Sequence, residues 1–162
     1  DRDIGAQYEY SNLGAGLLGH TLALKSGITY EQLVVNRICN ELGLKNTTIS
    51  LTPQQQVLLA KGHVGDTEVA NFDWQALAGA GALCSTASDM LTFLSAEMGL
   101  KVTKLYPAME KTQIAFAPMD TPGYEVGLGW CIAKKFNSEI ICHAGETGGY
   151  KSFMGFDKKN KK

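Results

Sequence analysis

The sequence has no long hydrophobic run, and this absence excludes several classes of protein. A membrane-spanning helix needs about 20 consecutive apolar residues, and no apolar run in this chain reaches that length. The opening stretch, DRDIGAQ, has neither an initiator methionine nor the apolar segment of a secretory signal. We therefore expect no transmembrane segment, and we interpret the chain as a mature form, a processed piece or a cloned segment.

The sequence also has no excess of charge of either sign. Its 15 Lys and Arg residues and 16 Asp and Glu residues give a net charge of -1, without the basic stripe that a nucleic-acid-binding protein needs. We therefore expect no nucleic-acid partner, and we interpret the C-terminal DKKNKK as a solvated turn or chain end. With 44% hydrophobic residues, the composition is typical of a globular domain with one core.

The cysteines lack the Cys-x-x-Cys spacing of zinc ribbons and thioredoxin-type sites, so we expect no metal site. Two of them, Cys131 and Cys142, can face each other across a hairpin. The interpretation that we favour is that the cysteines are free and buried, because free cysteine behaves as a small hydrophobic residue. They are Cys39, Cys84, Cys131 and Cys142.

Helix signals dominate the first two thirds of the chain. Apolar residues at helical spacing run from Leu13 to Lys25, and Gly27 follows as a stop. Three further helices are indicated by capping-box pairs, in which a Thr is followed three residues later by an amide or acid. The pairs are Thr29 with Gln32, Thr52 with Gln55, and Thr86 with Asp89. Residues 62–82 show no period, which predicts one long loop, and a weaker helical stretch covers about 107–115.

The last third of the chain has strand signals instead. YEVGLGWCIAKKFNSEIICHAG is typical of two strands around a turn near Asn137 and Ser138, and GYKSFMGFD alternates like a third strand. Helices followed by an antiparallel meander indicate an α+β fold. We expect a single domain over residues 1–162, mainly helical in 1–120 and formed by antiparallel strands in 121–162.

The stretch YEYSNLGAGLLGH contains two motifs with different meanings. Gly14, Gly16 and Gly19 form Gly-x-Gly-x-x-Gly, a pattern shared with dinucleotide-binding loops. Such a loop must follow a buried apolar strand inside a βαβ unit, whereas polar and aromatic residues precede it here and helices follow. We therefore interpret the glycines as small residues that let one helix pack closely against a neighbour.

The second motif in this stretch is Tyr10-Ser11-Asn12, which precedes a predicted helix. One interpretation is structural, with Ser11 or Asn12 acting as the N-cap. The other is chemical. A tyrosine whose pKa is lowered by cationic neighbours can take a proton from a hydroxyl nucleophile, and Asn12 can direct its amide toward the same cleft.

His143-Ala144-Gly145 lies near the end of a predicted strand. The histidine is interpreted either as a packed residue or as part of a site. Gly145 leaves the strand edge uncluttered, so a substrate backbone can align there and a strand N–H can point at a developing oxyanion. A Ser-His-Asp triad is arithmetically possible, but the sequence has no Gly-x-Ser-x-Gly elbow.

Taken in order, these motifs and their neighbours form a recognisable series. From about Gln7 to Asp157, the sequence resembles the serine β-lactamase-like family, which includes class C β-lactamases, D-alanyl-D-alanine carboxypeptidases, D-aminopeptidases and related esterases. Tyr-x-Asn alone is weak, but the blocks together are specific. The blocks are YEYSNLGAGLLGH, ELGLKNTTIS, AGAGALCSTASDMLTFL, GLGW and HAGETGGY.

The resemblance implies a role for each matching residue. Tyr10 matches the tyrosine that assists proton transfer to and from the nucleophilic serine, and Asn12 matches the asparagine that contacts substrate and the catalytic lysine. His143 with Gly145 matches the Lys-Thr-Gly element, which is often His-x-Gly in the esterase and peptidase branches. Glu146 falls where the family's strand supplies an oxyanion-hole backbone N–H.

One departure from the family pattern is serious. The family's nucleophile lies in Ser-x-x-Lys before Tyr-x-Asn, and no lysine of this chain has a serine three residues earlier. The chain also stops at GFDKKNKK, where the family continues with further strands and a helix. The resemblance therefore implies an internal piece of an incomplete domain, without the nucleophile and inactive alone, that can self-associate through its incomplete sheet.

For the parent protein, the resemblance implies a periplasmic or secreted serine acyl hydrolase without a cofactor. It would hydrolyse an ester, a β-lactam or a D-amino-acid peptide through an acyl-enzyme, with a small-molecule or peptide acyl substrate. The alternative is a non-catalytic family member that acts as a binding or interaction module.

Overall fold

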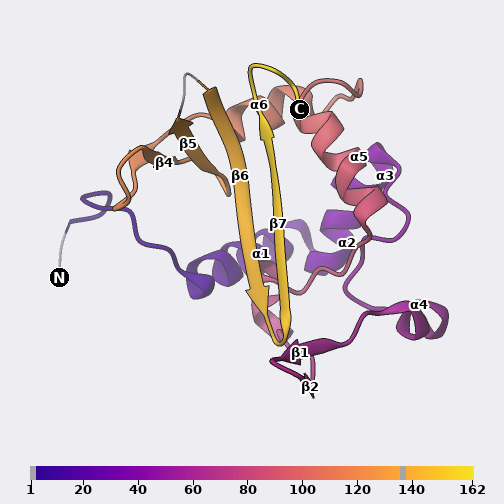
Figure 1. Ribbon diagram of the computed structural model, residues 1–162. Helices are drawn as coiled ribbons and strands as arrows, with labels where there is room; N and C mark the ends of the chain where they lie inside the picture. Colours follow the sequence, from indigo (N-terminus) through magenta and orange to yellow (C-terminus); the bar gives the residue numbers. More distant parts are fainter. Residues whose placement is uncertain (1–2, 136–137) are drawn as a thin grey trace. The chain divides into compact units, whose positions relative to one another are not determined.

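The computed structural model describes residues 3–135 and 138–162. Helices occupy the first part of the chain and an antiparallel sheet the last (Figure 1), so the fold is α+β, as predicted. The residues form two compact units. We call Ser11–Met90 with Gly145–Ser152 the helical unit, and Asp1–Tyr10, Leu91–Ala144 and Phe153–Lys162 the sheet unit.

The predicted capping signals form the helices of the helical unit. Thr29 and Gln32 make both hydrogen bonds of a capping box, and so do Thr52 and Gln55. A π-helical turn continues the helix that Thr29 caps, and Gly43 ends that helix in the left-handed conformation, with φ of 70°. The elements are α1 (Asn12–Ser26), α2 (Tyr30–Val34), η1 (Val35–Cys39), α3 (Asn40–Leu42) and α4 (Pro53–Leu58).

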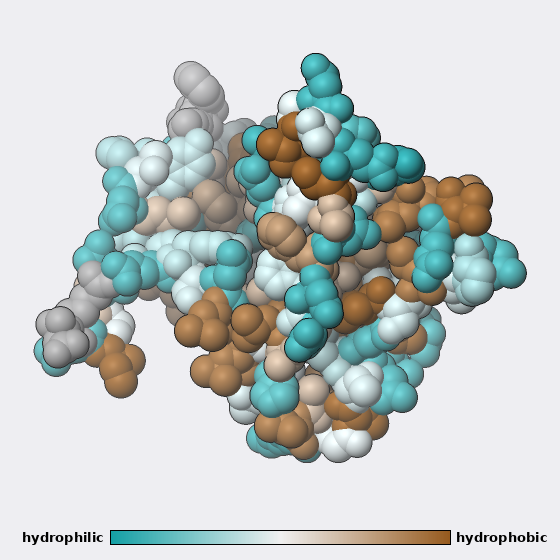
Figure 2. Space-filling model, turned by 90° about the horizontal axis from the view of Figure 1, so that it is seen from below, coloured by the Kyte–Doolittle hydropathy of each residue, from teal (hydrophilic) through white to brown (hydrophobic). Residues whose placement is uncertain are grey.

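Gly16 and Gly19 form the buried face of α1, which confirms the packing interpretation for these two, whereas Gly14 is exposed and does not pack. The buried residues of this helix are Gly16 and Gly19. A Cβ on Gly16 would lie 2.7 Å from Leu77, and one on Gly19 would lie 3.0 Å from the Cα of Gly79. The leucines whose spacing indicates the helix are largely exposed, and Figure 2 shows apolar side chains on the molecular surface.

We predict opposite effects when alanine replaces two glycines of α1. Alanine favours a helix by about 1 kcal/mol over glycine, and a Cβ at Gly14 would meet its nearest neighbour at an ordinary 3.4 Å. Gly14→Ala should therefore stabilise the protein by up to about 1 kcal/mol. Gly19→Ala should instead cost about 1–3 kcal/mol, as overpacking does, because backbone stands in the way. Urea denaturation measures both, and equal stabilities would contradict this packing.

The prediction of one long loop over residues 62–82 is wrong. Strands β1 (Gly62–Val64) and β2 (Thr67–Val69) pair in an antiparallel hairpin, and a 3-10 helix, η2 (Gln75–Ala80), follows. Strands of three residues are too short to show an alternating pattern, and η2 is held by its contacts with α1. These contacts are distant in sequence, so local pattern did not reveal them.

The predicted cap at Thr86 is present, but its partner has another function. The Thr86 hydroxyl accepts a hydrogen bond from the N–H of Asp89 at 3.2 Å, before helix α5 (Ala87–Glu97). The buried Asp89 carboxylate accepts from the backbone N–H of Asn46 at 2.7 Å and from the Thr47 hydroxyl at 2.9 Å. Asp89 therefore ties its helix to the segment after α3 and does not serve the cap alone.

The sheet unit contains a five-stranded antiparallel meander in the order β3-β4-β5-β6-β7 (Figure 1). Its core is Trp130, Ile132, Ile141 and Phe156, with Phe93, Leu94, Met98 and Met154 packed against it. The strand predicted over GYKSFMGFD is present as β7, and the second strand of the predicted pair is present as β6. The first strand of that pair is wrong as one strand, because the chain turns at residues 127–130 and divides it into β4 and β5, which pair with each other. The turn predicted near Asn137 lies partly outside the described residues. The elements are α6 (Tyr106–Thr112), β3 (Ala117–Pro118), β4 (Tyr124–Val126), β5 (Cys131–Lys135), β6 (Ser138–Thr147) and β7 (Tyr150–Asp157).

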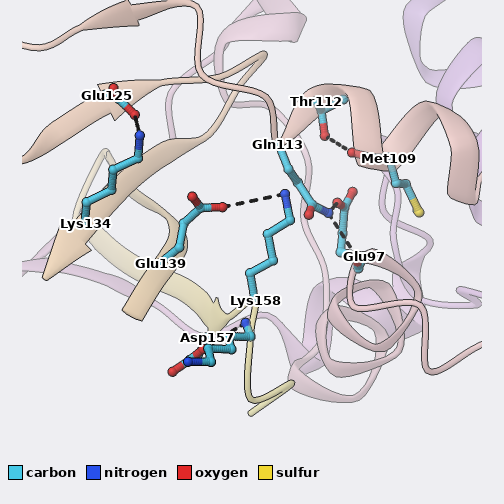
Figure 3. Close-up of polar contacts among 10 residues, drawn as sticks. Glu97, Met109, Thr112, Gln113, Glu125, Lys134, Glu139, Asp157 and Lys158 are labelled. Carbon is cyan, nitrogen blue, oxygen red and sulfur yellow. Dashed lines mark hydrogen bonds and ion pairs between the residues drawn. The ribbon is translucent and has the colours of Figure 1, made fainter. Parts of the chain in front are cut away.

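A buried carboxylate joins the end of α5 to the end of α6. Glu97 is 4% exposed, and its carboxylate accepts a hydrogen bond from the Gln113 side-chain amide at 2.8 Å (Figure 3). The same amide nitrogen donates to the Glu97 backbone carbonyl at 2.9 Å. Burial raises the pKa of Glu97, and the hydrogen bond from Gln113 lowers it by less.

We predict that Glu97→Gln stabilises the protein at neutral pH. A carboxyl group with a raised folded-state pKa stabilises the fold fully below its unfolded pKa, and that stability is lost as pH rises through the folded pKa. The Gln side chain does not ionise, so the variant does not lose this stability as pH rises. The difference in free energy of unfolding between Glu97→Gln and wild type should therefore grow between about pH 4 and 7, by about 1.4 kcal/mol for each unit by which the folded pKa of Glu97 exceeds the unfolded one. Urea denaturation against pH measures this. The exposed Glu110, changed to Gln, is the control, and a constant Glu97→Gln difference would contradict the prediction.

Candidate functional site

Tyr10-Ser11-Asn12 forms the entry into α1, and each residue has a different position. Ser11 is the N-cap, with φ of -145° and ψ of 114°, and its hydroxyl accepts from the N–H of Gly14 at 2.9 Å. Asn12 is the first residue of the helix, and Tyr10 precedes the cap with 63% of its surface exposed. Of the two caps considered from the sequence, Ser11 is the one used. The structural explanation of the motif therefore covers Ser11 and does not account for Tyr10 or Asn12.

His143 lies within β6, two residues after the fully buried Ile141. Alternate residues of a strand share one face of the sheet, so His143 is on the same face as the core residue Ile141. The imidazole is half-buried. This position fits either interpretation made from the sequence, a packed histidine or part of a site.

Gly145 and Glu146 follow on the same strand. A Cβ on Gly145 would lie 2.9 Å from the Ser152 hydroxyl oxygen, so the glycine permits close pairing with the neighbouring β7. The Glu146 carboxylate lies 3.6 Å from the Lys151 ammonium, with both side chains well exposed. Such a surface pair contributes little to stability, so the sequence-based role of Glu146, donation of its backbone N–H, does not depend on this side chain.

The turn between β6 and β7 is anchored to strand β1, a feature that sequence reasoning missed. The His63 N–H donates to the Gly149 carbonyl at 2.9 Å, and the Tyr150 hydroxyl donates to the Ala60 carbonyl at 2.6 Å. A Cβ on Gly149 would lie 2.5 Å from the His63 nitrogen. The close backbone approach indicated by the paired glycines of ETGGY is therefore made by the chain itself. It holds the end of β6 in place.

The candidate residues form two short groups along the chain. Tyr10 and Asn12 flank the cap of α1, and His143, Gly145 and Glu146 share strand β6. Tyr10 and His143 belong to the sheet unit, and the other three belong to the helical unit. Their assignment to one active site stays a prediction.

Each group offers a definite chemistry. A phenol can transfer a proton, and an amide can donate and accept hydrogen bonds. An imidazole can transfer a proton near neutral pH and can also donate and accept hydrogen bonds. Among residues 3–135 and 138–162, no three His, Cys, Asp or Glu side chains are grouped so that they could hold a metal ion. In the same described segments, no helix combines the length and apolar character that a membrane crossing requires.

Comparison with known proteins identifies the family. The beta-lactamase family model matches residues 1–162, so the chain belongs to the beta-lactamase family. The D-alanyl-D-alanine-carboxypeptidase/endopeptidase AmpH of Escherichia coli K12 is 32% identical over 93% of this chain and 42% of its own length. A beta-lactamase of Pseudomonas fluorescens is 33% identical over 78% of this chain and 36% of its own.

A solved structure supports the fold independently. A class C beta-lactamase superimposes with a TM-score of 0.88 at 20% identity, over 99% of this chain and 52% of that protein. The predicted family and the α+β fold are confirmed. The chain thus spans 42% or less of these curated relatives and about half of the solved structure.

We predict that mutation of the cap residue Ser11 and mutation of the next residue, Asn12, have different effects on stability. Ser11→Ala removes the acceptor for the Gly14 N–H and should cost about 0.5–2 kcal/mol, as loss of an N-cap side chain does. Asn12→Ala, one residue later, removes no capping bond and should leave stability within about 0.5 kcal/mol, as most surface changes do. Thermal and urea denaturation of both variants provide the comparison. A large loss in Asn12→Ala would assign this asparagine a structural role.

Proposed function

We propose that this chain is part of a serine acyl hydrolase that acts on D-amino-acid peptides or esters through an acyl-enzyme. The observation that carries the proposal is the division of labour in Tyr10-Ser11-Asn12. Ser11 fulfils the capping requirement of α1, so a phenol and an amide remain beside a helix N-terminus without a local structural reason. Acyl transfer needs groups of these kinds beside its nucleophile.

The proposed mechanism assigns one step to each residue. The Tyr10 phenolate takes the proton of a serine hydroxyl as that oxygen attacks the substrate carbonyl, and Tyr10 then returns the proton to the leaving group. Asn12 orients the substrate through its amide. The backbone N–H of Glu146 stabilises the oxyanion, for which a fixed strand is suitable. The turn after β6 is anchored by hydrogen bonds to β1 and to the residues before it, and this anchoring fixes the end of β6.

His143 favours peptidase or esterase activity over β-lactam hydrolysis. It occupies the place where the resemblance puts a lysine in β-lactamases, and an imidazole is neutral over much of the pH range in which a lysine is charged. The carboxypeptidase/endopeptidase AmpH is also among the relatives of the chain. We place the protein in the periplasm or outside the cell, where such substrates occur.

Covalent labelling tests this function. A protein that carries this chain together with an upstream Ser-x-x-Lys segment should form one adduct with a fluorescent penicillin or a fluorophosphonate, on the serine of that segment. The present chain alone should remain unlabelled, because no lysine in it has a serine three residues earlier. Intact-mass measurement distinguishes the two cases.

The Tyr10→Phe variant tests the proton-transfer step within that longer protein. Removal of the phenolic oxygen should lower kcat by about 10²–10⁴-fold, the usual contribution of general acid–base catalysis, with a much smaller change in KM. Steady-state hydrolysis of an activated ester measures both constants. Tyr8→Phe is the matched control, since it removes a phenol two residues earlier. An unchanged kcat in Tyr10→Phe would remove Tyr10 from the mechanism.

The alternative function is that of a non-catalytic family member. If the natural protein lacks Ser-x-x-Lys, the chain belongs to such a member, which keeps the fold to bind peptide-like partners. Such a protein would bind a D-alanyl-D-alanine peptide reversibly without forming an adduct. Calorimetric titration combined with the labelling experiment separates binding from catalysis.

A further inference from the structure

Three sulfur atoms gather on one part of the sheet unit. The Sγ of Cys131 lies 3.6 Å from the Sδ of Met119, and Cys131 lies directly opposite Cys142 in the pairing of β5 with β6. Side chains of directly opposed residues lie on the same face of a sheet. Burial and the neighbouring Cys142 thiol raise the pKa of Cys131. All three residues are half-buried.

The backbone hydrogen bonds identify the kind of pair that Cys131 and Cys142 form. The Trp130 carbonyl accepts from Gly127, and the Lys134 N–H donates to Gly123, so these two residues of the β5 segment point toward β4. Successive residues of a strand direct their N–H and C=O groups to opposite neighbours. Cys131 therefore directs both groups toward β6, and Cys131 with Cys142 is a hydrogen-bonded pair.

This geometry is unfavourable for a disulfide. The Cβ atoms of opposed residues lie about 4.5–5.5 Å apart, with hydrogen-bonded pairs at the wide end. A relaxed disulfide needs a Cβ separation of about 3.5–4.5 Å. For a pair at the wide end, closing the bond would have to pull the two Cβ atoms together by about 1–2 Å, and both thiols are free.

The same spacing suits a metal ion. Metal–thiolate bonds are about 2.3 Å long, so three sulfur ligands at the corners of a trigonal site lie about 4 Å from one another. The 3.6 Å between Cys131 and Met119 is close to that value. Thiolate and thioether ligands together select soft ions, Cu(I) in particular.

We propose that Met119, Cys131 and Cys142 form a binding site for a soft monovalent metal ion, Cu(I). On binding, each thiol releases its proton to solvent, and the ion accepts an electron pair from each thiolate and one from the thioether. The complex carries one net negative charge, and no oxidation step is involved. Nothing in this site draws on the residues of the proposed acyl transfer.

A cavity of about 340 Å³ borders Met119. Its lining includes Tyr8 and Met119, and burial, followed by the neighbouring Tyr10 and Cys131, raises the pKa of Tyr8. The remaining cysteines lack such surroundings. Cys39 is buried with its thiol 3.8 Å from the Thr47 carbonyl, and Cys84 lies in an isolated bridge to Thr48.

Anaerobic titration of the full chain with Cu(I), against a chromophoric Cu(I) chelator, tests the proposal. We expect one ion per chain by native mass spectrometry and three sulfur neighbours by X-ray absorption. Cys131→Ser and Cys142→Ser should abolish competition with the chelator. Met119→Leu, which preserves volume, should weaken binding by at least the ~10-fold that even an outer-shell partner contributes.

Cys84→Ser is the control variant, and its affinity should equal that of the wild type. Circular dichroism checks that each variant is folded. If a serine variant does not fold, the Cu(I) affinity of Met119→Leu tests the proposal in its place. Equal Cu(I) affinity in wild type and the Cys131→Ser/Cys142→Ser double variant would overturn the proposal. So would a Cys131–Cys142 disulfide in protein purified under air, found by peptide mapping, because the pair would then close without metal.

Discussion

The close approach of α1 and η2 is the contact on which the helical unit depends. Two glycines on α1 let the backbones meet, since a Cβ on Gly19 would lie 3.0 Å from the Cα of Gly79. From the other side, a Cβ on Gly79 would lie 3.0 Å from the Ala15 carbonyl oxygen. Such contact tolerates no side chain, so it fixes the position of α1. The start of α1 carries Ser11 and Asn12, and the packing of small residues therefore determines where these polar groups lie.

Local signals were sufficient wherever one short segment makes its own hydrogen bonds. The capping boxes at Thr29 and Thr52 were read correctly because donor and acceptor are three residues apart. Asp89 was only half predicted, since its carboxylate bonds Asn46 and Thr47, more than forty residues away. The hairpin β1–β2 was also missed because of a contact distant in sequence. A two-stranded hairpin of three-residue strands is marginally stable by itself, and the hydrogen bond between His63 and Gly149 helps to stabilise it.

The candidate site shows the same limit. The motifs were visible because each is contiguous, Tyr10 to Asn12 at a helix start and His143 to Glu146 along a strand. Their local roles follow from the structure of each segment, as the capping bond of Ser11 shows. The sulfur group was invisible as a site, because Met119, Cys131 and Cys142 meet only through strand register. Spacing along the sequence had suggested the facing cysteines and could not suggest the methionine.

Strand alternation separates the two proposed chemistries of the sheet unit. Ile141 is fully buried on the core face of β6, so His143 shares that face and Cys142 lies on the opposite one. A metal ion bound to Cys142 would therefore not contact the imidazole of His143, although one peptide bond joins the two residues. The coupling that remains is through the backbone, because Cys142 pairs with Cys131 by hydrogen bonds. An ion that draws the two thiolates together would tighten this pair and make the strand that carries His143 more rigid, without changing its charge.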